Sequence, residues 1–249
     1  MGKKNRHQLT RDIPESVKRQ VRQRDGFGCI ICGVGIYEYD HFNPEFSEAR
    51  FHDPNGIISL CARCHTMKEK GLLARVTIEN RIQNPRCQEQ GFSREVFDVG
   101  SNHPTIILGK TTFFNVRCLL KVHGEDLFSI LPPDSSADFF RINAKMSDTL
   151  GKVFFEIHEN EWRVRSENWD AEQTANRIII RKGPGDIVLA LRSEPPNILI
   201  VEQLHMQWRS AMIDVTEGAS PIARVKSRAA GFDTTETTIT GADVAIEIR

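Results

Sequence analysis

The sequence from Cys29 to Cys64 reads CIICGVGIYEYDHFNPEFSEARFHDPNGIISLCARC, and both of its ends carry the same cysteine spacing. Cys29 and Cys32 form one C-x-x-C pair, Cys61 and Cys64 form a second pair, and residues 33–60 separate them. Two residues between ligands let both sulfurs of a pair reach one metal ion, and two pairs complete a tetrahedral four-thiolate site. The spacing therefore predicts a structural zinc site that leaves no coordination position open for catalysis.

The chain around these cysteines is too short and too polar to form a large core. Apolar runs favour one strand at Tyr37–Tyr39, a second at Ile57–Leu60 and a helix over Ala62–Lys70. Redox pairs and ordinary buried thiols are the competing interpretations, but redox pairs accompany a βαβ pattern that is absent from this order of elements. So little apolar mass is expected to need a metal ion for stability.

A second set of motifs lies between and just after the cysteine pairs. Asp40-His41 follows the first pair, Pro44 stands three residues past the histidine, and Cys64–Lys68 reads Cys-His-x-x-Lys. This pattern resembles the HNH endonucleases over about Pro14–Leu73, under a third of the chain. The resemblance implies a small ββα-metal fold clamped by structural zinc, and hydrolysis of DNA phosphodiester bonds with a divalent metal ion.

The resemblance also implies roles for individual residues. His41 is the expected general base, Asp40 and His65 are the expected ligands of a catalytic Mg²⁺ or Mn²⁺ ion, and Asn55 is expected to orient His41. Neutral imidazole is a suitable base near pH 7, and an ion held by few protein ligands keeps positions open for phosphate. Here Gly56 stands where the family usually has its middle asparagine, and we expect a bulge at Gly56 to restore the geometry.

Three neighbouring polar residues are weaker candidates for the same site. Asn43 could substitute for Asn55, but a turn residue before a proline is the simpler interpretation. His52 and Asp53 could complete a ligand set, although we interpret both as loop residues.

The N-terminal segment is basic, with eight Lys or Arg against three Asp or Glu through residue 25. Residues 1–12 are predicted to form a flexible basic arm, and Ile13–Asp25 is predicted to form a helix. Its basic face is either solvated or an electrostatic contact for DNA phosphates. We interpret it as a DNA contact, with these predicted phosphate-binding residues: Lys18, Arg19, Arg22 and, on the following helix, Lys68.

The remaining chain has a different character. Residues 13–80 are predicted to be the nuclease domain, 81–104 a linker, 105–216 a β-rich accessory domain and 217–249 a C-terminal tail. Turn signals separate many short β-favouring runs, which favours a sandwich or barrel, with a solenoid as the alternative. These runs are Thr105–Leu108, Phe113–Val116, Leu127–Leu131, Phe139–Ile142, Val153–Ile157, Arg177–Arg181, Ile187–Leu191 and Ile198–Glu202. The overall expectation is an α+β protein.

Composition limits the remaining function classes. The chain has 249 residues, a formal net charge of zero and no apolar run long enough to cross a bilayer. No secretory signal is recognisable, so we expect a cytoplasmic protein without a membrane partner. Residues 81–249 carry 20 Lys or Arg against 23 Asp or Glu, which disfavours a non-specific DNA clamp.

The sequence therefore predicts a metal-dependent endonuclease with a β-rich domain for partner binding, oligomerisation or sensing. Nuclease domains fused to such modules are common in bacterial restriction and anti-phage defence, which is an analogy at the level of the fold. The alternative is a zinc-stabilised DNA-binding or scaffold module with an inactive nuclease site. The presence of Asp40, His41 and His65 favours the enzyme.

Overall fold

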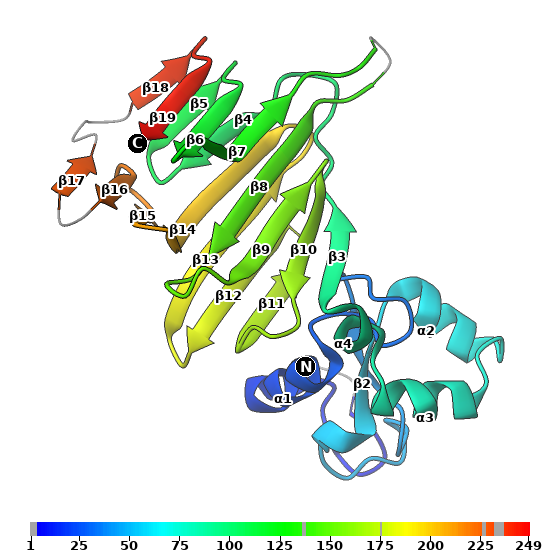
Figure 1. Cartoon of the computed structure of the whole chain (residues 1–249). Helices are drawn as coiled ribbons and strands as arrows, with labels where there is room; N and C mark the ends of the chain where they lie inside the picture. The colour runs from blue at the N-terminus through cyan, green and yellow to red at the C-terminus, as the bar shows by residue number, and fades with distance from the viewer. Residues whose placement is uncertain (1–3, 136–137, 175, 226–227, 232–236) are drawn as a thin grey trace. The chain divides into compact units, whose positions relative to one another are not determined.

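The computed structural model divides the chain into two compact units (Figure 1). The first contains residues 1–95 together with Val164–Glu172, and the second contains Val96–Arg163 and Gln173–Arg249. The structure describes residues 4–135, 138–174, 176–225, 228–231 (backbone only) and 237–249. None of the helices in these described parts is long and apolar enough to cross a membrane.

The first unit contains short elements arranged around the cysteine-rich stretch. In chain order they are α1 (Glu15–Asp25), β1 (Glu38–His41), the 3-10 turn η1 (Pro54–Gly56), β2 (Ile57–Leu60), α2 (Ala62–Glu69), α3 (Arg75–Gln83), α4 (Arg86–Gln90) and β3 (Phe92–Val96). Strands β1 and β2 are antiparallel, with Asp40 opposite Ile58 and His41 opposite Ile57. The strands and helices expected from the sequence up to α2 are present, each within a few residues of its predicted bounds.

The core of the first unit is small and contains the cysteines themselves. Ile58 and Leu60 of β2 pack with Ile30, Phe42 and Ile78, beside three of the cysteines. Strand β2 is buried along its whole length. This arrangement agrees with the expectation that apolar mass alone is scarce in this part of the chain.

Helix α1 is anchored through polar groups as well as apolar ones. Asp25 at its C-terminus is fully buried and accepts a hydrogen bond from the Ser59 backbone amide of β2, at 2.8 Å. Burial raises the pKa of Asp25, and the neighbouring Arg24 opposes that rise. The buried carboxylate therefore ties the end of α1 to the strand that precedes α2.

A distant segment of the chain completes the first unit. Arg22 of α1 forms a two-point ion pair with Asp170, with N–O distances of 2.6 and 2.8 Å, and both side chains are almost completely buried. In addition, the Gln23 side chain donates to the Trp169 carbonyl, and the Ser166 amide donates to the Gly91 carbonyl. Residues 164–172 span the end of one strand, the following turn and the start of the next strand, and they belong to the first unit.

The second unit consists of two β-sheets. One has the order β19-β6-β7-β8-β9-β10, from these strands: β6 (Cys118–Val122), β7 (Glu125–Leu131), β8 (Arg141–Ser147), β9 (Val153–His158), β10 (Glu161–Arg165) and β19 (Val244–Ile248). The other runs β12-β13-β14-β15-β16-β17, from β12 (Arg177–Gly183), β13 (Asp186–Glu194), β14 (Ile198–Trp208), β15 (Ala211–Thr216), β16 (Ile222–Val225) and β17 (Arg228–Gly231). Strand β4 (Thr105–Leu108) pairs with β14, β5 (Thr111–Phe114) with β4, and β18 (Thr237–Thr240) with β5, while β11 (Asp170–Thr174) lies at the boundary of the units.

The two sheets face each other across an apolar interior. The Ser147 hydroxyl of β8 donates to the Gln207 carbonyl of β14, and β8 lies in front of β14 in Figure 1. Side chains from both sheets also line an apolar cavity of about 310 Å³, among them Leu120 and Phe128 from one sheet and Leu204 and Ile213 from the other. The molecule is thus mostly β, with few helices and several sheets, as expected for an α+β chain with a β-rich part.

Two predicted segments differ from their expected character. The predicted linker 81–104 contains the end of α3, all of α4 and strand β3, because Cys87 is buried in the first unit and the Arg86 amide bonds to the Ile30 carbonyl. The predicted tail 217–249 contributes β16 to β19, and β19 pairs in parallel with β6. Its residues 226–227 and 232–236 lie outside the described residues.

Candidate functional site: a four-cysteine cluster and a histidine groove

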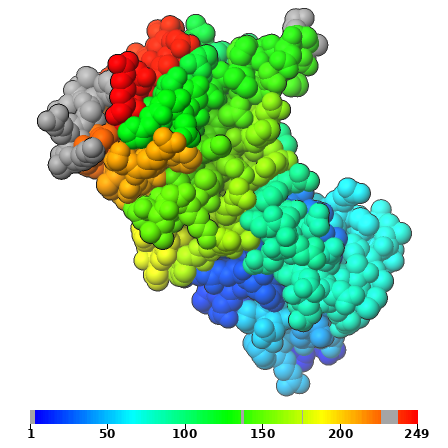
Figure 2. All heavy atoms as spheres, viewed as in Figure 1, coloured from blue at the N-terminus to red at the C-terminus, as the bar shows by residue number. Residues whose placement is uncertain are grey.

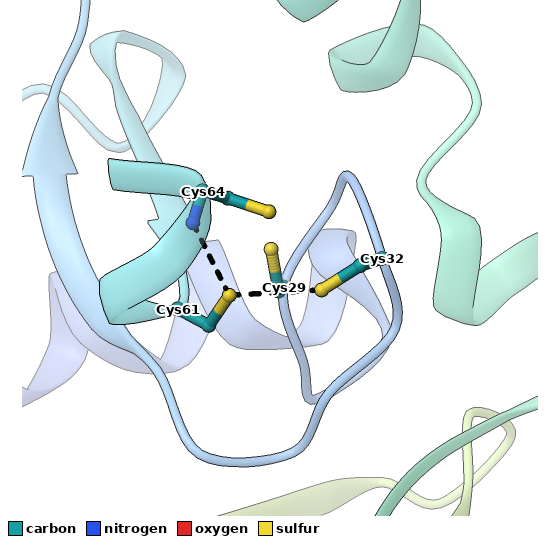
Figure 3. Close-up of side chains that lie close together, drawn as sticks. All are labelled: Cys29, Cys32, Cys61 and Cys64. Atoms are coloured by element: carbon teal, nitrogen blue, oxygen red, sulfur yellow. Dashed lines mark hydrogen bonds between the residues drawn. The ribbon is translucent and has the colours of Figure 1, made fainter. Parts of the chain in front are cut away.

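The four predicted zinc ligands come together at the start of α2. Their sulfur atoms all lie within 4.8 Å of one another, and the sulfurs of Cys32 and Cys61 are 3.6 Å apart (Figure 3). With zinc–sulfur bonds of about 2.3 Å, four tetrahedral thiolates lie about 3.8 Å from one another, so the donors fit such an ion. Among the described residues, this is the only close group of three or more side chains able to hold a metal ion.

Local backbone geometry brings each pair of cysteines to the same point. The amide of Gly33 donates to the Cys29 carbonyl, and Gly33 has a φ of +81°, which closes the turn around the first pair. Cys61 caps α2, where its sulfur accepts a hydrogen bond from the Cys64 amide, and Cys64 lies in the first turn of the helix. The sequence spacing thus translates directly into two turns whose sulfur atoms face one another.

The electrostatics of the cluster favour a thiolate. Hydrogen bonding from Cys29 lowers the pKa of Cys32 to about 5, even though burial opposes this shift. Burial and the neighbouring thiols raise the pKa of Cys64 to about 12. Sulfurs crowded in this way favour a bound cation, because an ion of charge +2 relieves their mutual repulsion.

A second cluster lies on the other side of the β2–α2 junction and contains Asp40, His65 and Lys68. The Lys68 ammonium donates to one carboxylate oxygen of Asp40 at 2.7 Å, and His65 Nε2 is 3.5 Å from the other oxygen. This ion pair raises the pKa of Lys68 against the opposing effect of burial. His65 directly follows Cys64, so the cysteine cluster determines where the imidazole lies.

Asp40 and His65 are suitable ligands for a divalent ion. Carboxylate oxygen and imidazole nitrogen bind such ions at about 2.0–2.2 Å, so two ligand atoms of one ion lie about 3–4 Å apart. The separation of 3.5 Å between His65 Nε2 and Asp40 Oδ1 falls in that range. Lys68 holds the second carboxylate oxygen and neutralises its charge.

The His41 side chain contacts the loop between β1 and η1. Its Nε2 is 3.1 Å from Nδ1 of His52, and its ring meets the edge of Phe46 with the centroids 5.3 Å apart. Burial lowers the pKa of His41, and the neighbouring His52 lowers it further. The lowered pKa favours the neutral form of the His41 ring.

Within the described interactions, Asn55 makes no contact with His41. It lies exposed in η1, and its described hydrogen bond runs from its own backbone amide to the Asp53 side chain. In this chain Gly56 stands at the position where the HNH endonucleases usually have their middle asparagine. A Cβ atom added at Gly56 would lie 2.2 Å from the Asn43 carbonyl oxygen. The Gly56 carbonyl also accepts from the amides of Phe42 and Asn43, so the backbones approach too closely there for any side chain.

The N-terminal segment forms a wall of the site. Asp40, His41, His65 and Lys68 line a polar groove of about 540 Å³, and its other lining residues include Lys4, Asn5, Arg6, Arg11, Glu45 and Phe46. Asn5 anchors this wall, because its side-chain amide donates to the Phe46 and Ala49 backbone carbonyls at 2.6 and 2.7 Å. The described part of the arm predicted to be flexible, residues 4–12, is thus packed against the loop beside His41.

The predicted phosphate contacts differ in their availability. Arg22 is 1% exposed and its guanidinium is bonded to Asp170 and Glu15, so the prediction that it contacts DNA is wrong. Arg19 is partly exposed, stacks over the Trp169 ring and lies 3.5 Å from Asp170, while Lys18 is half-buried. Of the four predicted phosphate-binding residues, Lys68 is the one that lines the groove. Helix α2, which carries Lys68, lies at the surface in Figure 2 (cyan).

Sequence reasoning missed several residues of the groove. Arg11, Arg6 and Lys4 were recognisable as a basic run, but nothing in the sequence indicated which surface they would line. His52 was visible as a histidine near the motif, and only the fold places it against His41. Comparisons with protein-family models, curated proteins and solved structures found no match for this chain.

Proposed function

We propose that the chain is a metal-dependent endonuclease that hydrolyses DNA phosphodiester bonds in the groove of the first unit. One observation carries the proposal: a neutral histidine, His41, lines the same groove as the suitable ligand pair Asp40 and His65. Phosphodiester hydrolysis needs a base for the attacking water and positive charge beside the phosphate oxygens. The groove has side chains for both requirements.

His41 acts as the general base in this proposal. Its lowered pKa keeps the imidazole unprotonated at neutral pH, ready to take a proton from water. Asp40 and His65 would hold Mg²⁺ or Mn²⁺, which supplies Lewis acidity to the phosphate and to the leaving oxygen. Lys68 donates to Asp40 and orients its carboxylate toward His65.

The finer fold assignment belongs to the same proposal. The antiparallel pair β1–β2 followed by α2 has the order of a ββα-metal nuclease, with Asp40 and His41 at the end of the first strand and His65 on the helix. The resemblance of the Asp40-His41 and Cys64–Lys68 motifs to HNH endonucleases supports this assignment. The four cysteines would hold zinc, which stabilises this unit without taking part in catalysis.

Basic residues at the groove support a polyanionic substrate. Lys4, Arg6 and Arg11 line it together with Lys68. Cationic side chains along a groove attract DNA phosphates whatever the base sequence. Guanidinium groups and protein backbone N–H groups then position the DNA through hydrogen bonds to those phosphates. We therefore propose that DNA enters along the wall that the N-terminal segment forms.

Plasmid cleavage by the full chain tests the function. Wild type and His41→Ala are incubated with supercoiled plasmid in EDTA, Mg²⁺ and Mn²⁺, with His158→Ala, an exposed histidine of the second unit, as the matched control. We expect wild type and His158→Ala to nick or linearise DNA only with added metal, and His41→Ala to be slower by about 10²–10⁴-fold. Equal cleavage by His41→Ala would refute the role of the base.

The second candidate is a DNA-binding or scaffold module with an inactive site. The Lys68–Asp40 ion pair favours it, because an ammonium occupies one of the two oxygens that an ion would use. For this candidate we expect a protein that retains zinc to retard the plasmid in a gel. We expect no cleavage of the plasmid with any divalent ion.

For the second unit we propose partner binding, oligomerisation or sensing, in a system such as restriction or anti-phage defence. Its excess of acidic over basic residues makes it a poor surface for DNA.

A further inference from the structure

His52 lies on the loop between β1 and η1, and its ring is within hydrogen-bond distance of the ring of His41. The two imidazoles meet through His41 Nε2 and His52 Nδ1 at 3.1 Å, with ring centroids 5.2 Å apart. Within the described residues, this contact is the hydrogen bond that the His41 side chain makes. Phe46, on the other side of the ring, offers only an aromatic edge.

The pairing has a consequence for the protons of both rings. A neutral imidazole carries one N–H donor and one acceptor nitrogen. If His41 donates from Nε2 to Nδ1 of His52, its own Nδ1 has a free lone pair. His52 then carries its proton on Nε2, a buried atom; burial lowers the pKa of His52, and the Thr10 backbone opposes that shift.

We propose that His52 is the positioning residue for the general base His41, the role that the sequence assigned to Asn55. His52 accepts the Nε2 proton of His41, selects the tautomer whose Nδ1 is basic, and holds the ring at one angle. When His41 takes a proton from water at Nδ1, the bond to His52 remains in place and stabilises the imidazolium. Asn55 is exposed and makes no described contact with either ring.

The surrounding loop supports this role because it is held from two sides. The amides of Glu48 and Ala49 bond to the Glu45 carbonyl, and Ala49 is buried. Asn5 donates to the Phe46 and Ala49 carbonyls, and Arg6 pairs with Glu48. A loop clamped in this way places His52 with little freedom, which an effective positioning group requires.

This inference rests on the proposed nuclease function, and the test separates the two. Full-length wild type, His52→Ala, His52→Phe and His52→Asn are compared in single-turnover cleavage of a DNA duplex with Mn²⁺. Phenylalanine keeps a ring of similar size without a nitrogen, while asparagine keeps a polar atom near the position of Nδ1. Zinc content and thermal unfolding are measured for each variant, and His158→Ala is the control.

We expect His52→Ala and His52→Phe to lower the maximal cleavage rate by about 10–100-fold, as the loss of a residue that orients a reacting imidazole does. The DNA concentration for half-maximal rate is expected to stay unchanged, and His52→Asn is expected to recover most of the rate. A merely structural residue would be replaced as well by phenylalanine as by asparagine.

Three results would overturn the inference. A wild-type rate in His52→Ala, with His41→Ala inactive, would show that His41 needs no partner, and the proposed function would stand. Equal losses in His52→Phe and His52→Asn would remove the hydrogen bond as the cause. Weaker Mn²⁺ binding by His52→Ala, measured by titration of the ion, would make His52 a metal ligand instead. Inactivity of wild type itself would count against the proposed function.

Discussion

The four-cysteine cluster and the histidine groove lie on the same short stretch of chain but have opposite surroundings. Cys64 is buried in the core of the first unit, and its neighbour His65 is directed to a groove and remains 40% exposed. The cysteine sulfurs face one another, whereas Asp40, His41 and His65 face space that a substrate can enter. A closed cluster is suited to holding the fold, and an open one is suited to chemistry.

This difference predicts different consequences of substitution. Changes in closed clusters should lower stability and reduce activity only through loss of fold. Changes in the groove should lower activity or affinity and leave the melting temperature nearly unchanged. The predictions below test this division, starting with the largest expected effect.

Removing one ligand of the closed cluster is expected to unfold the first unit. Structural zinc contributes on the order of 10 kcal/mol to small zinc domains, which is comparable to the total stability of a typical domain. We therefore expect Cys61→Ser to lose bound zinc, measured by zinc analysis. We also expect it to lose the unfolding transition of the first unit, measured by calorimetry. Cys118→Ser, at a buried thiol of the second unit, should retain zinc. A zinc-free Cys61→Ser protein with wild-type unfolding would contradict this prediction.

Arg22 and Asp170 form a second closed cluster, made of charges instead of thiols. Breaking a buried ion pair from one side leaves an uncompensated charge and costs about 3–5 kcal/mol. We expect Asp170→Asn to lower the free energy of unfolding by about that amount, measured by denaturant titration. Glu79→Gln, in the exposed pair with Arg75, is the matched control and should change little.

A double variant separates the buried charge from lost packing. Apolar residues of similar volume often replace a buried pair without loss, so Arg22→Met combined with Asp170→Leu should recover most of the stability. If the double variant is less stable than Asp170→Asn, the unpaired charge is not the cause.

The acid limit of cleavage tests the groove. The base acts only when it is neutral, so activity is complete above the pKa of His41 and falls as pH drops through it. Because burial and His52 lower that pKa, we expect the midpoint of the acid limb below the ordinary histidine value of about 6.5. Rates with saturating Mn²⁺ measure it, and simultaneous detection of released zinc shows whether the cysteine cluster still holds its ion. A midpoint above 7 with zinc retained would contradict the lowered pKa.

The smallest expected effect concerns a basic residue of the groove wall. Arg11 lies over the Phe46 ring at 4.9 Å and lines the groove. We expect Arg11→Gln to weaken DNA affinity and to reduce the slope of log K against log salt by about 1, without changing the melting temperature. Arg249→Gln, at the C-terminus of the second unit, should leave the slope unchanged. An equal change in both variants would indicate a general charge effect.

The parts of the fold that could be predicted have local causes. C-x-x-C spacing, a strand that reads Ile57–Leu60 and a helix that follows it depend on neighbouring residues, and the structure has all three. Asp40, His41 and His65, which the motif singled out, also line one groove. These features follow from spacing along a short chain segment.

The errors have a common physical reason, which is contact between residues far apart in sequence. The basic face of α1 appeared solvated or free for phosphate because Asp170 is 148 residues away from Arg22. The linker and tail appeared irregular because Gly and Pro marked turns, whereas burial of Cys87 and pairing of β19 with β6 made them structured. No local sequence pattern predicts a contact between residues so far apart in the sequence.

The sequence by itself determined which four cysteines would come together and the order of strand, strand and helix. These follow from covalent spacing and side-chain chemistry. Only the tertiary structure decided that Arg22 is buried, that residues 164–172 complete the first unit, and that His52 rather than Asn55 lies beside His41. Those outcomes depend on burial and on the close approach of Gly56 to the Asn43 carbonyl, which exist only once the chain has packed.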